Sequence, residues 1–222
     1  MACFAQVPCS VPALQELWTL VFGDPPALPQ AFFQHAFVPQ GCYYHSEAGE
    51  PVSALYLLPV ELRGARGAYL YAAATLPALR GRGYMRALVR EALAGARAAG
   101  LQFVYLCPAE EALYAFYEPL GFTQTLYGLY TSATAHPWTD EPAKMRSLAQ
   151  RSGIAPVFSP GVYRYAALAG CRVCEGLGCE FGDCCVFPSR AGTAGERGAI
   201  GMLAPLSGAF AATDFYPFLT MN

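Results

Sequence analysis

The stretch that decides the fold is LPALRGRGYM, residues Leu76–Met85, which lies between an apolar run and a helical pattern. The apolar run, residues 68–76, predicts a strand, and the pattern from Gly83 to about Ala99 predicts an amphipathic helix. A chain that passes through a glycine-bearing turn into a helix points backbone N–H groups at one spot, at the positive end of the helix dipole. Such a spot binds anions, so the stretch predicts a phosphate-binding turn.

The composition limits the classes of protein that need to be considered. The chain has 222 residues, of which 55% are hydrophobic and 14% charged, with a formal net charge of −2. This charge favours no nucleic-acid partner. No uninterrupted apolar segment reaches the roughly 20 residues of a membrane span, so we expect no membrane insertion. The first ten residues do not resemble a secretory signal, and nine cysteines then indicate reduced thiols in a cytoplasmic protein.

Helices and strands alternate around the turn in an order that predicts a mixed fold. Short links between the first three strands indicate an antiparallel meander, whereas the strand, helix and strand from residue 68 to residue 107 indicate a parallel crossover. The predicted helices are 11–22, 29–36, 83–99 and 110–120, and the predicted strands are 41–46, 52–62, 68–76, 101–107 and 122–130.

The composition changes after about residue 131, where a polar segment at 132–142 reads as a linker. We therefore predict a domain over residues 1–133 and a C-terminal lobe over residues 143–222. The lobe is expected to contain two short helices (143–150 and 161–168), a hairpin (171–188), a loop (190–198) and two strands (200–206 and 215–221).

Two motifs resemble those of the GNAT N-acetyltransferases. Arg80 and Gly83 match the family's motif of Arg or Gln, two residues, Gly, one residue and Gly or Ala, with Met85 at the last position. About 30 residues later, Tyr117 lies four residues before Gly121-Phe122, as in the family's second signature. The resemblance covers roughly residues 11–130. It implies an α+β fold with a central, mostly antiparallel mixed sheet flanked by helices, plus a smaller C-terminal α/β lobe.

The resemblance also implies an activity. The chain is similar to enzymes that transfer an acetyl group from acetyl-CoA to a primary amine of a small molecule or a peptide by direct attack. By this resemblance the CoA pantetheine arm adds to the strand before the turn through the backbone of Ala74 and Leu76. Tyr117 matches the tyrosine that acts as general acid to the CoA thiolate. The expected pyrophosphate cradle comprises Arg80, Gly81, Arg82, Gly83, Tyr84 and Met85.

The general base and the acceptor have no readable motif. Glu61 near the end of the second strand is the candidate base, with Tyr44 and His45 on the first strand as alternatives. A non-catalytic acyl-CoA-binding or regulatory module of the same fold is the competing interpretation. A nucleotide-binding protein is a third, which the absence of a Gly-Lys-Ser/Thr ending disfavours.

Cysteines in the C-terminal lobe invite a zinc interpretation, because Cys171 and Cys174 have the spacing of a zinc knuckle. No second such pair follows, so buried free thiols are the alternative and we expect no metal. The lobe has neither GNAT motif, which predicts no second cofactor site even if it is a reduced GNAT-like half. We expect it to cover the acceptor cleft or to form a homodimer contact.

Overall fold

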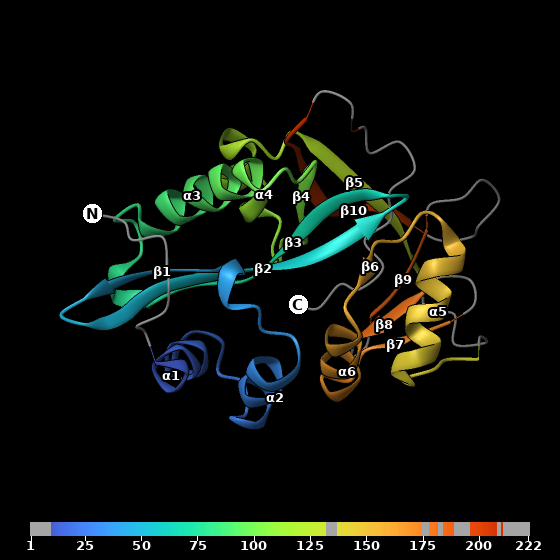
Figure 1. Cartoon of the computed structure of the whole chain (residues 1–222), viewed down its shortest axis with the longest axis horizontal. Helices are drawn as coiled ribbons and strands as arrows, with labels where there is room; N and C mark the ends of the chain where they lie inside the picture. The colour runs from blue at the N-terminus through green and yellow to red at the C-terminus, as the bar shows by residue number, and fades with distance from the viewer. Residues whose placement is uncertain are drawn as a thin grey trace.

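A mixed sheet forms the central layer of the protein (Figure 1). The computed structural model describes residues 10–131, 137–174, 178–181, 184–188, 196–207 and 210. The strand order is β1-β2-β3-β4-β10-β5-β9-β8-β7, and β6 pairs with β2. The strands are β1 Cys42–Glu47, β2 Glu50–Leu62, β3 Ala65–Thr75, β4 Phe103–Leu106, β5 Gln124–Thr131, β6 Val157–Phe158, β7 Arg172–Val173, β8 Cys179–Phe181, β9 Cys184–Pro188 and β10 Glu196–Pro205.

Among the described strands, β3 and β4 form a parallel pair and the other pairs are antiparallel. The predicted mixed α+β fold, with a mostly antiparallel sheet flanked by helices, is confirmed. The helices are α1 Val11–Phe22, α2 Ala27–His35, α3 Tyr84–Ala98, α4 Ala112–Tyr117, α5 Pro142–Ser152 and α6 Pro160–Leu168, with 3-10 turns at Pro39–Gly41, Pro77–Leu79 and Glu118–Leu120.

Helices cover both faces of the sheet, with α3 and α4 on one side and α1 and α2 on the other (Figure 1). The alternation of side chains along a strand produces the two apolar layers. On β2, Leu55 and Leu57 pack in the cluster with α3, whereas Tyr56, Leu58 and Val60 pack in the cluster with α1 and α2. None of the described helices is long and apolar enough to cross a membrane.

Several predicted boundaries were wrong. The helix predicted over 110–120 is limited to α4 and the 3-10 turn Glu118–Leu120, because Pro119 cannot donate a helical hydrogen bond. The predicted hairpin over 171–188 contains three short strands, β7, β8 and β9, and β10 begins inside the loop predicted over 190–198. The strand predicted over 215–221 lies outside the described residues.

The strand β10 comes from the C-terminal part of the chain but lies between β4 and β5. Gly201 on β10 is buried, and a Cβ added there would lie 2.8 Å from the carbonyl oxygen of Leu106 on β4. Helix α6 also packs closely against α2, since a Cβ added at Gly161 would clash with the carbonyl of His35. The sheet therefore continues past the predicted boundary at 133–143, and the division into two domains stays a prediction.

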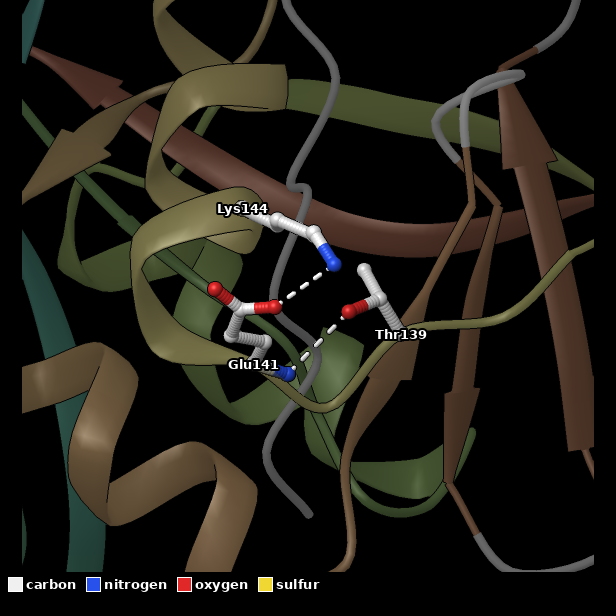
Figure 2. Close-up of polar contacts among 3 residues, drawn as sticks. All are labelled: Thr139, Glu141 and Lys144. Atoms are coloured by element: carbon white, nitrogen blue, oxygen red, sulfur yellow. Dashed lines mark hydrogen bonds and ion pairs between the residues drawn. The ribbon is translucent and has the colours of Figure 1, made fainter.

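Polar contacts of Thr139, Glu141 and Lys144 surround the start of α5 (Figure 2). The backbone N–H of Glu141 donates to Thr139 Oγ1 at 3.1 Å, and Lys144 Nζ lies 2.7 Å from Glu141 Oε2. Both members of this ion pair are more than half exposed, so it adds little stability. Packing of Met145 and Leu148 on the same helix against the core holds α5 instead.

Replacing Gly201 by valine tests whether β10 is built into the central sheet. The added side chain has no room against Leu106, so we expect a loss of about 1–3 kcal/mol in the free energy of unfolding. Ala199→Val, at an exposed position of the same strand, is the matched control. Thermal unfolding followed by circular dichroism gives both values, and equal midpoints for the two variants would contradict this placement of β10.

Candidate active site

The parallel pair β3 and β4 separates after only three residues. Its register runs from Gly67 with Phe103 to Tyr69 with Tyr105. Beyond this point β3 contains a bulge, because two residues, Ala72 and Ala73, face a single residue on β2. Ala72 has a φ of 47°, in the left-handed region that alanine rarely occupies. A bulge bends its strand and increases the local twist, which carries β3 away from β4.

A pocket of about 200 Å³ occupies this gap. Tyr69 and Tyr71 in its wall belong to the face that carries α1, whereas Leu113 and Tyr117 belong to the α3 and α4 face. The pocket therefore passes through the plane of the sheet. Its lining consists of Trp18, Phe22, Asp24, Tyr69, Leu70, Tyr71, Ala72, Ala73, Leu106, Cys107, Pro108, Ala109, Leu113 and Tyr117.

The glycine turn follows β3 and begins α3. Gly81 and Gly83 have φ values of 80° and 86°, which explains glycine at both positions. Gly83 is the N-cap residue of α3 and offers no side-chain hydrogen bond to the first turn. The first amides of α3 are thus free to bind an anion, and residues 80–83 are exposed around them. With Arg80 and Arg82 beside it, the turn fits a pyrophosphate.

The backbone hydrogen bonds at the end of β3 show which of its residues face β2 and which face the gap. The Leu76 N–H donates to the Val52 carbonyl at 3.0 Å, and the Ala74 carbonyl accepts from Ser53 Oγ at 3.0 Å. Both residues therefore face β2. Because backbone groups alternate along a regular strand, Thr75 faces the open side, where its carbonyl accepts from Arg80 Nε at 3.3 Å. A pantetheine arm added to this open edge would therefore contact the backbone of Thr75, whereas Ala74 and Leu76 stay predictions.

The side chains of Tyr84 and Met85 contact other parts of the protein and not the predicted anion site. The Tyr84 hydroxyl donates a short hydrogen bond to the Glu47 carboxylate, and its ring stacks on His45 with centroids 4.4 Å apart. Met85 packs against the α3-side core. These contacts fasten the first turn of α3 to β1, so the contribution of both residues to an anion site is limited to their N–H groups.

Tyr117 lies at the end of α4 and lines the pocket. Its side chain is 6% exposed and packs edge-on against Phe116 and Phe122, with centroids 5.0 and 5.6 Å away. Burial raises the pKa of Tyr117 to about 12, because the phenolate would lose its hydration. The phenol therefore keeps its proton across the neutral range and is a weak acid in the wall of the gap.

The three candidate bases do not line the pocket. Glu61 is exposed, and its backbone partner on β3 is Arg66 beside the β2–β3 turn, whereas the pocket-lining Tyr69 is opposite Leu58. Glu61 therefore lies three strand residues beyond Leu58, about 10 Å at roughly 3.3 Å per residue. Tyr44 packs with the α1-side core, and His45 stacks on Tyr84. The structure therefore gives no geometric support to a base at these positions.

Trp18 and Asp24 line the pocket together, although no sequence motif marks either residue as part of a site. The Trp18 indole N–H donates to Asp24 Oδ2 at 2.8 Å, which holds the carboxylate at the pocket. An aspartate directly after the glycine that ends an aromatic helix was the signal available, but it names no site without the topology.

Two cysteines of the predicted C-terminal lobe, Cys171 and Cys174, lie in the described part of the structure. Cys171 and Cys174 are buried thiols. Among the described residues no three His, Cys, Asp or Glu side chains gather closely enough to hold a metal ion. The side chains of Cys179, Cys184 and Cys185 lie outside the described part of the structure, so the zinc alternative is not tested there.

The sequence and the fold are both similar to those of known proteins. A family model described as an acetyltransferase (GNAT) domain matches residues 10–125, slightly more than half of the chain. A search among proteins of curated function gave no match.

Solved structures share the fold at low sequence identity. Eis1 from Mycobacterium abscessus superposes with a TM-score of 0.58 at 15% identity over 82% of this chain and 52% of that one. A GCN5-related N-acetyltransferase from Anabaena variabilis gives 0.55 at 16% identity, over 72% and 46%. One from Kribbella flavida gives 0.56 at 15% identity, over 90% and 71%. The chain thus spans about half the length of the first two.

Substituting Gly83 tests the anion site. Asp and Asn tolerate the left-handed conformation about equally and have the same size, so Gly83→Asn is a matched control for Gly83→Asp. The carboxylate should repel a pyrophosphate, and we expect the Asp variant to bind coenzyme A at least about tenfold more weakly than the Asn variant in low salt. Isothermal titration with coenzyme A measures both affinities. Equal dissociation constants would remove the turn from the site.

Proposed function

Because the chain belongs to the GNAT acetyltransferase family, we propose that it transfers the acetyl group of acetyl-CoA to a primary amine of a small molecule or a peptide. The family match supports acyl transfer from acetyl-CoA. The amine acceptor and the roles of individual residues are part of the proposal.

The observation that carries the proposal is the pocket through the sheet. One side of it contains Tyr117 and lies on the α3 face, where the glycine turn offers its amides. The other side contains Trp18 and Asp24. A thioester that extends from the turn along the open edge of β3 would reach the gap from the first side. An acceptor entering from the second side would meet it there, which supplies the proximity that such a reaction needs.

The proposed reaction is a direct transfer. The unprotonated amine nitrogen attacks the thioester carbonyl carbon and forms the N–C bond. The tetrahedral intermediate then expels the CoA thiolate as the C–S bond breaks. The nitrogen loses one proton and the sulfur gains one, so no external reagent is consumed. Tyr117 is the proposed proton or hydrogen-bond donor to the sulfur, and its proton is restored from the nitrogen through water or a neighbouring group.

The raised pKa of Tyr117 favours hydrogen-bond donation to the sulfur over full proton transfer. Full proton transfer from this phenol, whose pKa burial raises to about 12, costs free energy unless the same desolvation raises the pKa of the thiol as much. Donation of a hydrogen bond to the developing thiolate has no such cost. Since the gap is lined mainly by apolar and aromatic groups, that bond is stronger than it would be in water. We therefore assign Tyr117 to thiolate stabilisation, with full proton transfer late in the reaction.

Tyr117→Phe tests the catalytic role. The substitution keeps the ring packing on Phe116 and Phe122 but removes the hydroxyl, so kcat should fall about 10²-fold while the affinity for acetyl-CoA is unchanged. Tyr127→Phe, on an exposed tyrosine outside the pocket, is the control. Release of free thiol in the presence of amines gives the rates. Acetyl-CoA binding without turnover, and no effect of Tyr117→Phe, would favour a non-catalytic acyl-CoA-binding module.

The pH dependence gives a second test of Tyr117. A tyrosine of ordinary pKa, about 10, would lose its proton as the pH rises through 10. With its pKa raised to about 12, Tyr117 keeps the proton until the pH approaches that value. We expect kcat to show no loss linked to Tyr117 between pH 8 and pH 10. A decline centred near pH 10 that Tyr117→Phe abolishes would contradict the buried, protonated phenol.

A further inference from the structure

We propose that the α1 side of the pocket binds an acceptor with a single positive charge and a flat apolar body, and that Asp24 binds its ammonium group. This inference rests on the proposed function and names the substrate class for the same pocket.

The charge inside the pocket is the first observation. Asp24 is the one Asp or Glu among the described residues that line it, and no lysine, arginine or histidine is among them. The carboxylate thus has no cation beside it in the pocket wall. A ligand that enters this side meets a single negative charge, which attracts one ammonium group and repels a carboxylate.

The hydrogen bonding of Asp24 leaves acceptor capacity for a ligand. The Trp18 indole N–H donates to Oδ2 at 2.8 Å. In the described part of the chain Oδ1 has no hydrogen bond and Asp24 has no ion pair. An ionised carboxylate accepts several hydrogen bonds, so Asp24 is held in place by one partner and retains the remaining positions. Fixing the carboxylate in advance lowers the entropy that a ligand must lose on binding.

Aromatic rings form most of the wall around this carboxylate. Trp18, Tyr69 and Tyr71 come from the α1 side of the sheet, and Phe22, which is 43% exposed, lies at the pocket beside them. Such walls bind flat apolar groups, and their faces also attract a cation. An acceptor with several positive charges would find one carboxylate only and would leave its other charges against aromatic surface. The lining therefore favours an arylalkyl amine over a polyamine.

The field of Asp24 reaches the same wall. Burial raises the pKa of Tyr165 to about 12, and the negative charge of Asp24 adds to this rise. Burial also raises the pKa of Tyr71 well above its usual value, with further contributions from Tyr165 and Asp24. The Tyr71 and Tyr165 hydroxyls lie 2.7 Å apart and are hydrogen-bonded to each other. Asp24 therefore lies close enough to these two hydroxyls for its negative charge to act on them.

Binding can be measured without turnover, because Trp18 touches the carboxylate. The chain has two tryptophans, so in a Trp138→Phe background the intrinsic fluorescence reports on Trp18 alone. The probes are 2-phenylethylamine, the neutral 2-phenylethanol, phenylalanine with its added carboxylate, and spermidine. Asp24→Asn keeps an oxygen acceptor for the indole and removes the charge. Glu16→Gln, which changes an exposed carboxylate on α1, is the matched control.

We expect 2-phenylethylamine to bind more tightly than the other three probes, and Asp24→Asn to weaken it about tenfold or more without changing the affinity for 2-phenylethanol. The Glu16→Gln protein should match the wild type. Equal affinity for 2-phenylethylamine in the wild type and Asp24→Asn, or preference for spermidine or phenylalanine, would overturn the inference.

A parallel assay of thiol release from acetyl-CoA separates this inference from the proposed function. Turnover of 2-phenylethylamine with a KM raised about tenfold in Asp24→Asn supports both. Turnover that is equally efficient in wild type and Asp24→Asn leaves the enzyme standing and overturns the role of Asp24. Charge-dependent amine binding with no turnover of any amine supports the Asp24 site and overturns the proposed enzyme.

Discussion

The separation of β3 from β4 is the constraint on which the rest of the site depends. Three residue pairs hold the two strands together, and the bulge at Ala72 then carries β3 away. Without it the parallel pair would continue and the sheet would be closed between its two faces. The left-handed conformation of Ala72 is unfavourable for an alanine. It persists because β2 pairs with β3 on both sides of the bulge.

The two faces of the sheet then supply different chemistry to one gap. The α3 face contributes uncapped helix amides and a buried phenol, which suit an anionic donor and a developing thiolate. The α1 face contributes an aromatic wall and one carboxylate. The C-terminal part of the chain supports this second side, because the Tyr165 hydroxyl of α6 is hydrogen-bonded to Tyr71 in the wall. This contact agrees with a C-terminal segment that covers the acceptor side, although covering the cleft remains a proposal.

Local sequence patterns predicted the parts of the site that are local in the chain. The glycine turn was predictable because positive φ, a helix start and a preceding strand are all encoded within Leu76–Met85. Long-range pairing was not: β10 enters the sheet between β4 and β5, and no periodicity reveals a partner. Nor does a local pattern reveal the bulge at Ala72, which changes the residues of β3 that face outwards. No sequence pattern marks Asp24, because its proposed role depends on the gap that the bulge creates.

The central claim is that the gap between β3 and β4 is where donor and acceptor meet. A crystal structure of the protein with coenzyme A tests it most directly, with the position of the thiol sulfur located by its anomalous scattering. We expect the pyrophosphate at the amides of residues 81–85, the pantetheine arm beside Thr75, and the sulfur in the gap near Tyr117. A sulfur outside the gap, or a coenzyme bound away from the glycine turn, would contradict it.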